Sequence, residues 1–267
     1  MPDDSRHTKV DMPAGAAPGD AGVPQAEAPT DGDLPADLRP DLCRLPRERL
    51  ETLQAAAAEV VECHRVLAKA GLSVVGEVLE GQGAFVVDQH YPRGDIYDRE
   101  THAQYYYHAH REGEHGHFHC FLRAPGMPAG LRPEPDPVRH GWPAGTAAIA
   151  HLVAIGMDRR GFATRLFTTN RWVTGETWYP APAVIAMLDG WAVDHARPNW
   201  AVNRWLGAML RLFRPQIEAL LIARDRVLAA RPGADPWEDR TLETVTEIPI
   251  DVAAQARDVA AALARHR

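Results

Sequence analysis

The spacing of apolar and polar residues along the chain alternates between two periods. Between residues 104 and 122 apolar and polar side chains alternate, and a period of two is the repeat of a β-strand. Glu112 and Gly113 interrupt this alternation, and glycine suits a tight turn. The pattern predicts a β-hairpin with strands at 104–111 and 114–122.

Other stretches carry apolar residues at helical spacing. The first helix is expected to begin near Pro46 and to stop at Gly71, because proline suits a first helical turn and glycine a C-terminal end. Further helical repeats lie at 184–191, 200–213 and 215–230, and Asp251 is placed to cap a final alanine-rich helix.

Several shorter segments favour strands or loops. Strands or extended segments are expected at 73–79, 151–157, 166–173, 177–179 and 241–250. Residues 88–98 are polar and interrupted by Pro and Gly, which predicts a loop. The long Pro- and Gly-rich stretch at 124–146 is typical of a lid or an insertion.

These elements predict a single α+β domain at residues 44–267. Antiparallel β-hairpins would form one sheet, flanked by an N-terminal helix and a helical C-terminal third. The helices are expected to cover one face of the sheet, leaving the other face for the polar side chains of the hairpin. Residues 1–43 are rich in Pro, Ala and Asp and have few large apolar side chains, so a disordered tail is expected.

Charge and composition exclude several classes of function. A net charge of −7 offers no basic surface for nucleic acid, and no apolar run is long enough to span a membrane. The N-terminus lacks the features of a signal peptide, and three widely spaced cysteines are expected to be reduced thiols. A cytoplasmic protein with a small-molecule ligand or substrate is predicted, with its oligomeric state left open.

The candidate chemistry lies in the hairpin. A two-residue turn at 112–113 pairs His110 with His115, His108 with His117, and Tyr106 with His119. All five histidines would then share one face, whereas a turn of odd length would divide them between the two faces. The predicted metal ligands are His108, His110, His115, His117 and His119. Cys120 alternates away from them.

Imidazole nitrogen is a ligand for Zn, Fe, Cu and Ni, and the favoured cofactor is a divalent transition metal, Zn or Fe. His151 could supply a ligand from a neighbouring strand. The hairpin register turns Glu114 away from the histidines, and whether it joins the metal site is left open. Ordinary strand histidines, hydrogen-bonded to tyrosines or carboxylates, are the alternative explanation for each of these residues taken singly.

Other polar residues are candidates for catalysis and substrate binding. Glu112, Asp88 or His90 could act as a base beside a metal-bound water. Tyr106, Asn170 and Arg171 are candidates to bind substrate. The alternatives are turn chemistry for the 88–98 segment and a solvent-facing strand side for Asn170 and Arg171.

Three segments carry a resemblance to a known family. YYYHAHR at 105–111, EHGHFH at 114–119 and LFTTNRWVTGE at 166–176 resemble an uncharacterised bacterial domain-of-unknown-function family, and the resemblance covers residues 45–265. It implies one domain and no particular activity. The spacing of His108, His110 and Glu114 is also similar to the first metal motif of cupins, although Phe121 stands where cupins have glycine.

Three hypotheses about function follow. The first is a metal-dependent enzyme with a mononuclear histidine site, of hydrolase or oxygenase type. The second is a non-catalytic protein that binds or senses a metal or haem. The third is a metal-free pocket of His and Tyr side chains for a small polar ligand.

Overall fold

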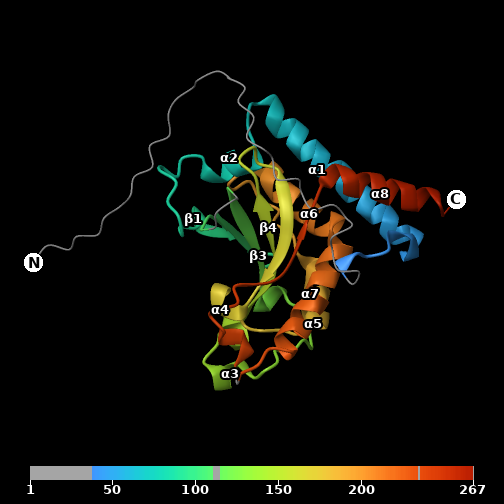
Figure 1. The fold of residues 1–267 in the computed structure, drawn as a ribbon. Coiled ribbons are helices and arrows are strands. Elements are labelled where there is room, and N and C mark those ends of the chain that lie inside the picture. Colours follow the sequence, from blue (N-terminus) through green and yellow to red (C-terminus); the bar gives the residue numbers. More distant parts are fainter. Residues whose placement is uncertain (1–37, 111–114, 234, 267) are drawn as a thin grey trace, which may run out of the picture.

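The structure is a computed structural model that describes residues 38–110, 115–233 and 235–266. Its strands form one antiparallel sheet in which each strand pairs with the next along the chain (Figure 1). The strands are β1 (Tyr91–Tyr97), β2 (Ala103–His108), β3 (Gly116–Arg123), β4 (Ile149–Met157), β5 (Ala163–Thr169) and β6 (Thr244–Pro249). The predicted α+β class with antiparallel hairpins is confirmed.

Helices precede, interrupt and follow this sheet. The helix α1 begins directly after Pro46 and ends before Gly71, which has a positive φ of 71°. The last helix begins after Asp251, whose side chain accepts a hydrogen bond from the Ala254 backbone at 2.7 Å, as predicted. The helices are α1 (Arg47–Lys69), α2 (Val74–Leu79), α3 (Pro137–His140), α4 (Arg171–Thr174), α5 (Ala181–Met187), α6 (Trp200–Leu212), α7 (Arg214–Ala229) and α8 (Val252–Ala264).

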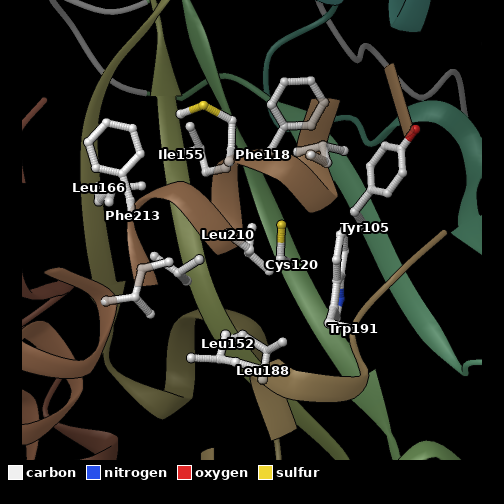
Figure 2. Packing of buried hydrophobic residues seen from close by; sticks show 14 of the residues in the cluster. Tyr105, Phe118, Cys120, Leu152, Ile155, Leu166, Leu188, Trp191, Leu210 and Phe213 are labelled. Carbon is white, nitrogen blue, oxygen red and sulfur yellow. The ribbon is translucent and has the colours of Figure 1, made fainter. Parts of the chain in front are cut away.

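One face of the sheet packs against helices and forms the main core, to which α1, α2, α5, α6 and α7 contribute. Alternate residues of β2 and β3, such as Tyr105 and Cys120, are fully buried against apolar residues that include Leu210 of α6 (Figure 2). Burying each large apolar side chain contributes about 1.5–3 kcal/mol. Because side chains alternate along a strand, this core commits the intervening residues, including the strand histidines, to the opposite face.

Four predicted elements differ from the structure. Residues 73–79 form a helix, because the Ser73 side chain accepts a hydrogen bond from the Gly76 backbone at 3.0 Å and caps α2. The 88–98 segment contains β1, an edge strand, where proline is tolerated. The strand expected at 166–173 ends at Thr169, after which Asn170 caps the short helix α4, and residues 177–179 lie outside the strands.

The described part of the chain begins inside the expected tail. Leu38 is buried in the main core, and Leu42 packs against a smaller cluster formed by α1 and α8. Residues 1–37, for which disorder was expected, lie outside the described residues. Among the described helices, none is both long and apolar enough to cross a membrane.

Candidate metal centre

Three histidines converge on the sheet face that lies opposite the main core. His108 comes from β2, and His117 and His119 come from β3. One ring nitrogen from each lies within 4.8 Å of the others, so the group could hold a metal ion. The register pairs His108 with His117 and Tyr106 with His119, as expected from an even connection.

Two of these nitrogens are spaced like two ligands of one ion. His108 Nε2 and His119 Nε2 lie 3.1 Å apart. Two nitrogens at about 2.0–2.1 Å from a zinc ion would be separated by about 2.9 Å at a right angle and about 3.4 Å at the tetrahedral angle. The observed separation falls in that interval, and it also permits a hydrogen bond between the two rings.

Burial favours the neutral imidazoles that bind metals. His117 and His119 are fully buried and His108 is 8 % exposed. Burial, followed by the neighbouring histidines, holds the pKa of His119 well below its usual value. A ring held neutral keeps a lone pair available, so this arrangement suits a cation far better than an anion.

His151, which the sequence left open as a candidate metal ligand, contacts the ring of His119. It belongs to β4, whose pairing with β3 shifts register between Cys120 and Phe121 and so sets His151 opposite Phe121. Its Nε2 is 3.0 Å from His119 Nδ1, and its Nδ1 is 3.3 Å from Thr169 Oγ1. Burial lowers the pKa of His151 to about 3. It therefore contacts a candidate ligand from the side away from His108.

Glu176 supports the same region and was missed by the sequence reasoning. Its Oε2 accepts a hydrogen bond from the His151 backbone N–H at 2.6 Å, and its Oε1 accepts one from Thr174 Oγ1 at 3.3 Å. Burial raises the pKa of Glu176 to about 7, against the attraction of Arg224. A carboxyl with such a pKa is a recognised mark of a functional region.

The exposed side of the cluster carries His110, His90 and Tyr106. The His110 ring lies 4.8 Å from that of His108, and its Nδ1 lies 3.7 Å from Glu243 Oε1. His90 stacks on Tyr106 with ring centroids 3.6 Å apart, and it meets the ring of His108 edge-on. The structure thus brings three further predicted site residues to the cluster.

His115 does not join them, so the expectation that all five histidines share one face is wrong. Its ring stacks on Phe85, and its Nδ1 lies 2.7 Å from the hydroxyl of Tyr107, a residue of the main core. Regular strand alternation begins only at Gly116, so it does not govern the preceding residue. The turn between the strands and the candidates Glu112 and Glu114 lie outside the described residues.

The structure gives structural roles away from the histidines to three predicted site residues, Asn170, Arg171 and Asp88. Asn170 accepts a hydrogen bond from the Arg171 backbone at 2.8 Å and donates one to the Pro236 carbonyl at 2.9 Å. Arg171 pairs with Glu238 at 2.9 Å and lies over the ring of Trp142. Asp88 is an exposed turn residue with a φ of 66°. The structure does not bring these side chains to the histidines, so their predicted roles gain no support.

The fold and the cluster define an α+β protein with buried histidines gathered on one face of an antiparallel sheet. The chain belongs to the family described as domain of unknown function (DUF6969), which matches residues 54–250 and so includes the whole cluster. No curated protein and no solved structure matches the chain. The weaker cupin resemblance therefore gains no support from these comparisons.

Proposed function

We propose that the protein binds one divalent transition metal ion through His108, His117 and His119 and uses this ion as the centre of an enzyme active site. The observation that carries the proposal is the convergence of three buried imidazoles from two paired strands, with one nitrogen of each within 4.8 Å of the others. Rigid neighbouring strands hold such a set in place before the ion binds, which reduces the ordering cost of binding.

Zinc fits this donor set better than iron does. Three neutral imidazoles leave the full charge of a divalent ion on the centre, and three protein ligands with an open fourth position are typical of catalytic zinc. Such an ion lowers the pKa of a bound water to about 7. Non-haem iron sites typically include a carboxylate, whereas the described cluster consists of histidines alone.

The groups on the exposed side suit a small polar substrate. Tyr106 is 7 % exposed, and burial raises the pKa of its phenol well above the usual value, so the hydroxyl stays protonated and can donate a hydrogen bond. His90 covers one side of this ring, and His110 lies at the rim with 20 % of its side chain exposed. Hydrolysis by a metal-bound water is the reaction class that these groups support best.

One observation favours a metal-free pocket as the second candidate. His108 and His119 contact each other through their Nε2 atoms at a distance that a direct hydrogen bond also explains. In that case the cluster would be a hydrogen-bonded pocket for a small polar ligand.

Zinc titration of the full-length protein, purified without a histidine tag and stripped of metal, distinguishes the two candidates. The proposal predicts one zinc ion per chain. His117→Ala should weaken binding at least 100-fold, whereas His115→Ala, which removes a histidine from the other side of the sheet, should leave binding unchanged. Failure of the wild type to bind zinc would contradict the metal proposal, as would equal losses in the two variants.

Turnover is tested separately, by screening the zinc-loaded protein against small ester, amide and phosphoester substrates. Hydrolysis that disappears in His117→Ala and persists in His115→Ala supports an enzyme. Tight zinc binding with the zinc coordinated only by protein atoms would instead indicate a binding or storage protein.

A further inference from the structure

A line of buried side chains leads away from the candidate metal position. From His119 it passes to His151 at 3.0 Å and from His151 to Thr169 at 3.3 Å, on β3, β4 and β5 respectively. All three residues are at most 2 % exposed, so bulk water does not compete for these contacts. Each contact uses a defined ring nitrogen, and this determines where the hydrogens can be.

Only two arrangements of hydrogens satisfy the whole line when each ring is neutral. In the outward arrangement His119 Nδ1–H donates to His151 Nε2, and His151 Nδ1–H donates to Thr169 Oγ1. In the inward arrangement Thr169 donates to His151 Nδ1, His151 Nε2–H donates to His119 Nδ1, and His119 Nε2–H points at His108. A neutral imidazole has one N–H, so mixed arrangements place two hydrogens or two lone pairs face to face.

The two arrangements differ in whether His119 can bind a metal. The outward arrangement leaves a lone pair on His119 Nε2, directed at His108 Nε2 3.1 Å away. The inward arrangement puts a hydrogen on the same nitrogen and closes that position. Metal-bound histidines commonly donate their second N–H to a neighbouring acceptor, which selects the tautomer and orients the ring.

We infer that His151 is a positioning residue that holds His119 in the tautomer able to bind the metal through Nε2, and that Thr169 orients His151 for this task. The inference rests on the proposed function and adds residues to it that do not contact the ion. In the metal-free protein both arrangements can form, because His108 Nε2 can either donate a hydrogen bond to His119 Nε2 or accept one from it. Metal binding then selects the outward arrangement.

Two further contacts support this role for His151. Its backbone N–H is held by the buried carboxyl of Glu176 at 2.6 Å, and its ring packs against Phe121 with centroids 5.1 Å apart. Both contacts restrict the ring to one position beside His119.

Matched variants of both supporting residues test the inference, with zinc as the probe and the full chain as the protein. His151→Phe keeps a ring but removes the acceptor, and it should weaken zinc binding about 10- to 100-fold. His151→Gln can keep an acceptor near the position of Nε2 and should retain most of the affinity. Thr169→Val should weaken binding, whereas Thr169→Ser should not. Thermal unfolding of each metal-free variant identifies any that fail to fold.

Nitrogen-15 spectra of the zinc-loaded wild type provide a reading that a merely structural role would not produce. The inference predicts that His151, which does not touch the ion, carries its hydrogen on Nδ1. A hydrogen on Nε2 of His151 would overturn it, and so would unchanged affinity in both His151→Phe and Thr169→Val. If the wild type binds zinc and His117→Ala does not, such a result refutes only the role of His151. If the wild type binds no zinc, the proposed function fails with it.

Discussion

Replacement of Glu176 by Gln should change the way in which stability depends on pH. The Glu176 side chain is 1 % exposed, and burial raises its pKa from 4.5 to about 7. Gln is close in shape to a protonated Glu and can keep an acceptor for the His151 backbone N–H. The variant therefore removes an ionisation and preserves most of the local contacts.

The sign and size of this change in stability follow from the linkage between protonation and folding. As pH rises above 4.5 the unfolded chain loses the Glu176 proton while the folded protein keeps it, so the folded state becomes relatively less stable until the pH passes about 7. The rise in the pKa of Glu176 from 4.5 to about 7 corresponds to a loss of roughly 3 kcal/mol in the free energy of unfolding, at about 1.4 kcal/mol for each pH unit. Most of this cost lies between pH 5 and pH 8, where it amounts to roughly 2–3 kcal/mol.

Urea unfolding of metal-free protein at pH 5 and pH 8 measures this effect. The advantage of Glu176→Gln over the wild type should grow by roughly 2–3 kcal/mol between the two pH values, because titrations shared by both proteins cancel in the difference. Glu80→Gln, the same change at an exposed site, is the control and should show no such growth. A flat or falling advantage for Glu176→Gln would show that the folded protein does not retain the Glu176 proton above pH 5.

Two further substitutions separate the support of the metal site from general stability. Gly116→Ala would place a Cβ 2.5 Å from the Tyr107 hydroxyl and 2.6 Å from the His108 carbonyl. It should therefore lower the free energy of unfolding, measured with urea, by about 1–3 kcal/mol. It should also weaken zinc binding, measured by titration. Asn170→Ala removes the cap of α4 and the hydrogen bond to Pro236, and it should cost about 1–2 kcal/mol while zinc affinity stays unchanged; a large loss of zinc binding would restore Asn170 to the site.

The central pairing of the hairpin could be predicted from the sequence because strand alternation is a local property. The pairs His108 with His117 and Tyr106 with His119 follow from a period of two and an even connection. His115 could not be placed in this way. Its position depends on the ring of Phe85 and the hydroxyl of Tyr107, which are contacts that alternation does not describe.

The residues that support the site could not be predicted from a local sequence pattern. Thr169 and Glu176 meet His151 across 18 and 25 positions of sequence, and the register shift in the β3–β4 pairing sets where His151 lies. The strand predicted at the position of α2 was wrong for a different reason. Its three valines favour a strand. The Ser73 cap and burial of one helical face outweighed their intrinsic preference.

X-ray absorption at the zinc edge of the zinc-loaded, untagged protein identifies the atoms that coordinate the ion. We expect three imidazole nitrogens at about 2.0–2.1 Å and one oxygen from solvent, with one imidazole fewer in His117→Ala. A spectrum with sulfur ligands, or with imidazole scattering that His117→Ala leaves unchanged, would contradict a metal centre built from His108, His117 and His119.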